Sequence, residues 1–164
     1  MQHVFLNAFC KNPIFENDRS LIDFLIKDII PHLRCPDDFI VKQDDDAAHF
    51  YYIVEGQCKV SIIDHKKQTI ELPYTLVTGN YFGEIGLLFN CKRTATVKSV
   101  NYCNFARIDK TKFEETPQKL LDQLKFQSYN YRDGFKQFKM KMLKQVDYLE
   151  TCTLDDRTMF YDEI

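Results

Sequence analysis

Apolar and polar residues alternate in short runs between residues 39 and 109, as in half-buried strands. Residues 50–54 and 57–63 fit two such strands joined by Glu55-Gly56, and residues 69–72 fit a return strand. Short strands separated by turn residues at intervals of about 8–12 positions are typical of an antiparallel β-roll or jelly roll. The pattern therefore predicts a β-roll over residues 39–109.

Helical spacing precedes the predicted roll. Residues 4–11 fit a short helix, and Asp18-Arg19-Ser20 is a typical helix start. Apolar residues then recur at three- and four-residue intervals, which predicts a helix as far as Pro31. These residues are Leu21, Phe24, Leu25 and Ile29. We expect residues 1–38 to form an N-terminal helical segment.

Helical spacing returns after residue 109. Residues 110–115 fit a short helix, and Pro117 suits the first turn of a longer one, where proline is tolerated. The spacing predicts C-terminal helices over residues 110–145 and, together with the roll, an α+β fold. The apolar positions of the longer helix are Leu120, Leu121, Leu124, Tyr131, Phe135, Phe138, Met142 and Leu143.

The last stretch, residues 146–164, contains a short internal repeat. Asp156-Arg157-Thr158-Met159-Phe160 repeats the pattern of Asp18-Arg19-Ser20-Leu21-Ile22, about one domain length further along the chain. Self-similarity at a fixed distance indicates repeated units of one kind. We expect residues 146–164 to open a second, tandem domain.

The composition excludes several classes of function. The formal net charge is −2 and Lys and Arg form no cluster, which argues against a nucleic-acid binder. The six cysteines form no Cys-x-x-Cys pair and the four histidines lie at no metal-ligand spacing, so we expect no metal site. The best apolar run, residues 21–30, is broken by three charges, so we expect no membrane span. Without a secretory signal, free thiols indicate a cytoplasmic location, which includes the cytoplasmic face of a membrane.

The stretch from Gly79 to Val97 carries the candidate chemistry. Gly83 and Gly86 allow backbone N–H groups to approach an anion, and a helical turn that begins there directs its unpaired donors at it. Arg93 adds a planar fork of N–H donors that fits phosphate oxygens. Glu84 would repel a phosphate, so its carboxylate suits a neutral sugar hydroxyl instead.

Residues 82–88, followed by residues 93–97, resemble the phosphate-binding cassette of cyclic nucleotide-binding domains. The nine-residue step from Glu84 to Arg93 equals the spacing in that family. Such domains occur in cyclic nucleotide-gated and hyperpolarisation-activated channels and in cAMP- and cGMP-dependent protein kinases. The resemblance implies a β-roll of the cyclic nucleotide-binding type, with flanking N-terminal helices and a C-terminal helical lid.

The resemblance also implies how a ligand, cAMP or cGMP, would be held, and it implies no cofactor. The guanidinium of Arg93 and the hydroxyl of Thr94 would contact the phosphate. Backbone N–H groups at Ile85 and Gly86 would add donors to the same phosphate.

The ribose and the base would be held by other residues. Glu84, beside Gly83, would take the ribose 2′-hydroxyl and so select against deoxyribose. Two residues of the roll would line the base pocket, and one of two residues of the last helix would cap the base. The four candidates are Val60, Tyr74, Tyr131 and Phe135.

The function that this resemblance implies is ligand sensing rather than catalysis. Cyclic nucleotide would shift the terminal helices and bias an attached effector, either a channel pore or a kinase domain. Three alternatives remain open from the sequence: a degenerate domain that binds nothing and serves assembly, a cupin-type metal enzyme, and a catabolite-activator-type transcription regulator. The cupin type needs a His-x-His pair that the chain lacks, and the acidic end at residues 155–163 is unlike a DNA-reading helix.

Overall fold

The computed structural model describes residues 8–10, 12–15, 19–64 and 66–128. Met1–Lys125 forms one compact unit, and Phe126–Ile164 forms a second, most of which lies outside the described residues. The strands of the first unit are β1 Ile30–Arg34, β2 Phe39–Val41, β3 His49–Glu55, β4 Gln57–Ile63, β5 Thr69–Val77, β6 Tyr81–Phe82, β7 Thr96–Ser99 and β8 Cys103–Asp109. Its helices are η1 Pro13–Phe15, α2 Arg19–Ile26, α3 Glu84–Leu88 and α4 Lys110–Glu114, and residues 118–128 are helical as well.

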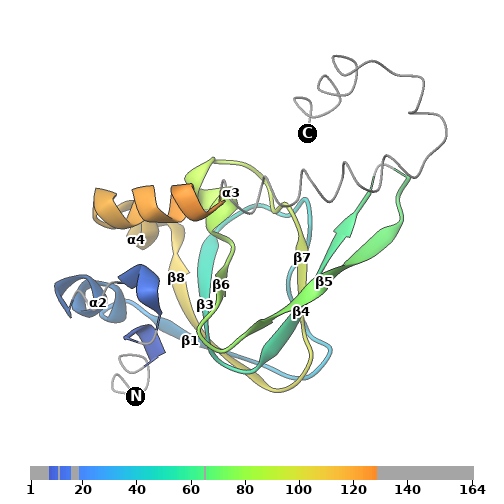
Figure 1. The fold of residues 1–164 in the computed structure, drawn as a ribbon, viewed down its shortest axis with the longest axis horizontal. Coiled ribbons are helices and arrows are strands. Elements are labelled where there is room, and N and C mark those ends of the chain that lie inside the picture. Colours follow the sequence, from blue (N-terminus) through green and yellow to red (C-terminus); the bar gives the residue numbers. More distant parts are fainter. Residues whose placement is uncertain (1–7, 11, 16–18, 65, 129–164) are drawn as a thin grey trace, which may run out of the picture. The chain divides into compact units, whose positions relative to one another are not determined.

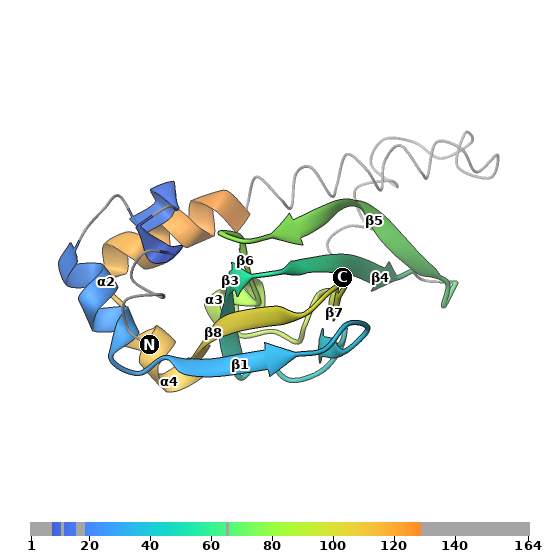
Figure 2. The ribbon, with the colours of Figure 1, turned by 90° about the horizontal axis from the view of Figure 1, so that it is seen from below.

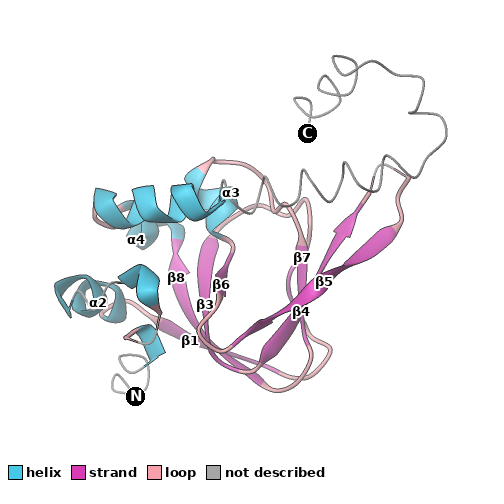
Figure 3. Ribbon diagram, viewed as in Figure 1, coloured by secondary structure: helices cyan, strands magenta, loops and turns pink. Residues whose placement is uncertain are grey.

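The eight strands form two four-stranded sheets in which every pair is antiparallel (Figure 1). One sheet has the order β1-β8-β3-β6 and the other the order β2-β7-β4-β5. Figures 2 and 3 show η1, α2 and α4 against the first sheet, with the second sheet on its other side. The α+β fold, an antiparallel β-roll with flanking helices, is confirmed.

The burial of β3 follows from this layered arrangement. Its five residues from Phe50 to Val54 are all buried, because helices cover one face and the second sheet covers the other. Phe50 and Tyr52 belong to the core shared with the helices. Tyr51 lies on the opposite face and stacks on Phe82 of β6 at a centroid distance of 5.1 Å. By contrast, β4 alternates between buried and more exposed positions, as its sequence predicts.

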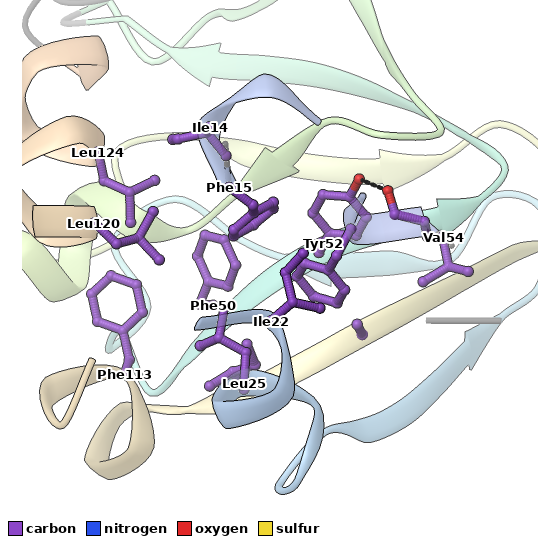
Figure 4. Close-up of a cluster of buried hydrophobic side chains, with 14 of the residues drawn as sticks. Ile14, Phe15, Ile22, Leu25, Phe50, Tyr52, Val54, Phe113, Leu120 and Leu124 are labelled. Atoms are coloured by element: carbon purple, nitrogen blue, oxygen red, sulfur yellow. Dashed lines mark hydrogen bonds between the residues drawn. The ribbon is translucent and has the colours of Figure 1, made fainter. Parts of the chain in front are cut away.

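The core on the helical side is apolar and rich in aromatic rings (Figure 4). Phe50 of β3 lies 5.4 Å from Phe113 of α4, measured between ring centroids. Tyr52 is fully buried, stacks on Phe9 at 4.4 Å and donates its hydroxyl hydrogen to the carbonyl of Ala8 at 2.7 Å. These contacts attach the N-terminal helices and α4 to the same strand.

The helix predicted as far as Pro31 is wrong at its end. The helix α2 stops at Ile26, and Pro31 lies inside β1, which pairs with β8. Proline can occupy this strand because β1 is an edge strand. On its outer side there is no neighbouring strand to which a backbone N–H would have to donate. The stretch 1–38, expected to be helical, therefore contains a strand.

The helices predicted after residue 109 agree with the structure up to residue 128. A short helix follows β8, and residues 118–128 are helical after Pro117, as predicted. Residues 129–145 of the predicted helices and the tail at 146–164 lie outside the described residues. In the part of the chain that the structure describes, we find no helix with the length and apolar character of a membrane span.

Candidate functional site

The candidate site begins with a glycine in the left-handed conformation. Gly83 has φ +87° and separates β6 from α3. A Cβ atom built on it would lie 2.6 Å from Nη1 of Arg93. Since glycine alone lacks this atom and adopts this φ without strain, Gly83 allows the guanidinium to pack against the start of α3.

Arg93 is the central cation of the site, and only 5% of it is exposed. Its Nη1 donates to the carbonyl of Gly83 at 2.8 Å, and its Nη2 donates to the carbonyl of His49 at 2.7 Å. Its Cζ lies 6.0 Å from the ring centroid of Tyr51. Among the described residues, no carboxylate lies within 4.0 Å of the guanidinium. Two neutral carbonyls therefore orient the cation, while the carboxylates of Glu84 and Asp45 act on it only from beyond 4.0 Å.

The acidic turn at residues 44–46 holds the backbone of Arg93. The N–H of Asp44 donates to the carbonyl of Arg93, and the N–H of Arg93 donates to the carbonyl of Asp45, both at 2.9 Å. This reciprocal pair of hydrogen bonds fixes the backbone that carries the guanidinium.

Glu84 is the first residue of α3 and is buried, with 6% of it exposed. Burial raises the pKa of its carboxyl to about 7, although its own backbone N–H and the charge of Arg93 both favour the ionised form. The same burial lowers the pKa of the Arg93 guanidinium, which the charge of Glu84 partly opposes. The site thus combines a permanent cation with a carboxyl group that titrates near neutral pH.

The other residues predicted to contact the phosphate follow Glu84 or Arg93 closely in the sequence. A Cβ on Gly86 would lie 2.5 Å from the Cβ of Ala47, and its carbonyl accepts a hydrogen bond from the N–H of Cys91 at 3.0 Å. Ile85 precedes Gly86 on α3 and is half-buried. Thr94 follows the buried arginine and is exposed. The structure thus places all the predicted phosphate contacts on α3 or directly beside Arg93.

The base pocket is described only in part. Val60 of β4 is buried and pairs with Val97 of β7. Tyr74 of β5 is 46% exposed. The two capping candidates, Tyr131 and Phe135, lie outside the described residues. The base pocket and its cap therefore stay predictions.

Sequence reasoning missed two residues of β3 that reach the site. The carbonyl of His49 orients Arg93, and the ring of Tyr51 lies beside the guanidinium. The alternation along β3 predicts that these two share a face of the strand. It does not predict that Arg93, 44 residues further along the sequence than His49, packs against that face.

A cavity of about 310 Å³ lies apart from the site, on the helical side of the first sheet. Its lining comes from η1, α2 and residues 117–123, and includes Ile14, Phe24 and Leu120. The lining is mainly apolar, so this cavity belongs to the helical core rather than to the anion site.

The fold and the site together define the class of protein: a β-roll that carries a buried guanidinium between β6 and β7. The family model of the cyclic nucleotide-binding domain matches residues 34–119, which is just over half of the chain. The chain belongs to this family. In this family the domain itself binds a regulatory ligand and is not catalytic.

Individual relatives agree with this assignment. The chain is 37% identical over 76 residues to a cAMP-dependent protein kinase regulatory subunit of Dictyostelium discoideum, a match that covers 45% of this chain and 23% of the relative. It is 28% identical over 104 residues to the human potassium/sodium hyperpolarization-activated cyclic nucleotide-gated channel 4, covering 63% of this chain and 8% of the channel. The matched stretch is thus less than a quarter of either relative.

A solved structure shows the same fold. The regulatory domain of Toxoplasma gondii PKA, crystallised with cAMP, superposes with a TM-score of 0.74 at 20% identity. The superposition covers 79% of this chain and 50% of that one.

Proposed function

We propose that the roll binds a cyclic nucleotide, cAMP or cGMP, and passes the binding event to an effector. The observation that supports this most directly is the buried Arg93 guanidinium, which has two backbone carbonyls as partners and, among the described residues, no carboxylate within 4.0 Å. A buried charge without a directly paired counter-ion is costly, and an anionic ligand would lower that cost.

The donors that Arg93 leaves free fit one phosphate group. A guanidinium has five N–H donors, and the carbonyls of Gly83 and His49 accept from two of them. The remaining donors can pair with the exocyclic oxygens of a cyclic phosphate in the bidentate manner that arginine favours. Backbone N–H groups at Ile85 and Gly86, with the hydroxyl of Thr94, would complete the phosphate contacts.

Arg93→Ala should weaken binding of cAMP and cGMP about 30-fold or more, since loss of a buried charge partner costs about 2–5 kcal/mol and about 1.4 kcal/mol is tenfold in affinity. Isothermal titration measures this directly. Arg93→Lys keeps the positive charge but loses the planar fork of donors, so its affinity should lie between those of the unmodified protein and Arg93→Ala. Arg19→Ala is the matched control, because that arginine is exposed on α2, where it pairs with Asp23.

The melting temperature of each variant separates loss of binding from loss of fold. Unchanged affinity in a folded Arg93→Ala protein would remove this residue from the site. If the unmodified protein binds neither cAMP nor cGMP in titration and in a thermal-shift screen, the sensor proposal fails and an assembly module remains.

Glu84→Ala should chiefly abolish discrimination between a cyclic nucleotide and its 2′-deoxy analogue. The ribose 2′-hydroxyl would donate to the buried carboxylate, so the unmodified protein should prefer the ribose form and the variant should bind both forms alike. Competition of cAMP and 2′-deoxy-cAMP against a fluorescent cyclic nucleotide tests this. A variant that keeps the full preference would assign the ribose contact to another group.

For the effector, we propose a kinase regulatory role or a channel regulatory role, the two kinds represented among the relatives. We also propose that residues 146–164 open a second domain of the same kind, which would favour the kinase type. Titration of the unmodified protein with cAMP and with cGMP shows which of the two it prefers.

A further inference from the structure

A second arginine lies on the same face of the first sheet as the candidate phosphate site. In the antiparallel pair β3–β8, Tyr51 is directly opposite Arg107, and His49 is directly opposite Asp109. Residues directly opposite one another project to the same face of a sheet. Arg107 therefore shares its face with Tyr51, whose ring lies beside Arg93.

The side chain of Arg107 is incompletely satisfied where it lies. Its Nε is buried and has no hydrogen-bond partner among the described residues, and only 25% of the side chain is exposed. Its nearest carboxylate oxygen, Oδ1 of Asp109, is 3.9 Å from Nε, beyond hydrogen-bond distance. Buried polar atoms of native proteins nearly always have partners, so an unpaired guanidinium nitrogen here needs an explanation.

A short chain of contacts connects Arg107 to Arg93. Nε2 of His49 lies 3.2 Å from Oδ1 of Asp109, and the carbonyl of the same histidine accepts from Nη2 of Arg93 at 2.7 Å. The charges of Arg93, Arg107 and Arg34 all act on the Tyr51 hydroxyl, where they oppose the rise in its pKa that burial causes. Two permanent cations, Arg93 and Arg107, thus lie near one tyrosine ring, with the carboxylate of Asp109 close to the second of them.

We propose that Arg107 is a second ligand-binding arginine of the site, and that its guanidinium contacts the phosphate of the cyclic nucleotide together with Arg93. The inference rests on the proposed function and adds a residue that the cassette alone does not supply. The Arg107 guanidinium is only loosely paired with Asp109 and can turn to an anion, whereas Arg93 is already oriented by two carbonyls. The site would then offer the ligand one preformed and one recruited cation.

The test is isothermal titration of cAMP and cGMP into the unmodified protein, Arg107→Ala and Arg107→Gln. We expect both variants to bind at least tenfold more weakly. The second variant keeps much of the side chain and guards against a loss of packing in the first. Arg34→Ala is the matched control: it removes an arginine from the same face of the sheet, opposite Cys103 at the far end of β8, and should bind within twofold of the unmodified protein.

A further variant distinguishes a ligand contact from a structural ion pair. Asp109→Asn removes the carboxylate but leaves the guanidinium, so affinity should be retained if Arg107 contacts the ligand. An equal loss of affinity in Asp109→Asn and Arg107→Ala would overturn the inference, as would binding by Arg107→Ala within twofold of the unmodified protein. If Arg93→Ala loses binding while Arg107→Ala does not, only this inference fails. If the unmodified protein binds no cyclic nucleotide, the proposed function fails and this inference fails with it.

Discussion

At the scale of single residues, the site depends on desolvation more than on direct pairing. Glu84 and Arg93 are both buried and carry opposite charges, yet no ion pair within 4.0 Å joins them in the part of the chain that the structure describes. Burial raises the pKa of the Glu84 carboxyl to about 7 from an ordinary value of 4.5. The folded protein therefore holds this proton more tightly than the unfolded chain does.

This difference predicts how the free energy of unfolding depends on pH. Below about pH 4.5 the carboxyl is protonated in both states, so the stabilisation from proton binding by the folded state is fully present. It is lost as the pH rises to about 7, by up to about 3 kcal/mol. Glu84→Gln cannot ionise and should be more stable than the unmodified protein by an amount that grows over this interval.

Urea unfolding of both proteins between pH 4.5 and 8 measures this difference. The half-buried histidines, His32 and His49, titrate in both proteins and cancel in the comparison. A difference in stability that stays constant with pH would show that Glu84 keeps an ordinary pKa in the folded protein.

At the scale of elements, α3 is positioned by close backbone contacts rather than by its length. It has five residues, too few for helix propensity to hold it, so its neighbours must fix it. Gly86 packs against Ala47 and Cys91 so closely that a Cβ would lie 2.5 Å from the Cβ of the first and 3.0 Å from the carbonyl oxygen of the second. This helix can approach Ala47, in the segment before β3, only because position 86 has no side chain.

Gly86→Ala should therefore destabilise the protein by about 1–3 kcal/mol, the usual cost of overpacking, even though alanine favours helices. Ala47→Gly removes the closest opposing atom. The double variant should recover part of the loss, leaving the contact with the Cys91 carbonyl. A thermodynamic cycle from urea unfolding of the four proteins gives the coupling, and purely additive effects would contradict the steric explanation.

The sequence was sufficient for those elements whose signal is local. A few neighbouring residues are enough to predict the alternation of β4, the helix start near Arg19 and the cassette. The structure contains each of these elements. The edge strand β1 was missed because Pro31 and the preceding helical spacing indicate a helix end. The partner of Arg93, the carbonyl of His49, depends on packing between segments 44 residues apart, which no local pattern encodes.

At the scale of the compact unit Met1–Lys125, one strand connects the site with the helices. Alternate residues of β3 project to opposite faces, so His49 and Tyr51 face the candidate site while Phe50 and Tyr52 pack in the helical core. A shift of β3 on ligand binding would therefore reach α4 through the contact of Phe50 with Phe113. Any such coupling is limited by the ligand's differential affinity for the two states.

The last prediction concerns this route. Cyclic nucleotide should increase the hydrogen-exchange protection of residues 110–125 in the unmodified protein. Phe50→Leu should reduce that increase. The affinity of this variant should stay within about threefold, because residue 50 faces away from the site. Ile62→Val is the control: Ile62 is also buried but lies on β4 in the second sheet, and the cost of this change is comparable, about 1 kcal/mol. Hydrogen exchange with mass spectrometry, with and without saturating cyclic nucleotide, provides the comparison. If Phe50→Leu transmits the same protection as Ile62→Val, the signal reaches the helices by a route other than the Phe50–Phe113 contact, and β3 serves only to build the site.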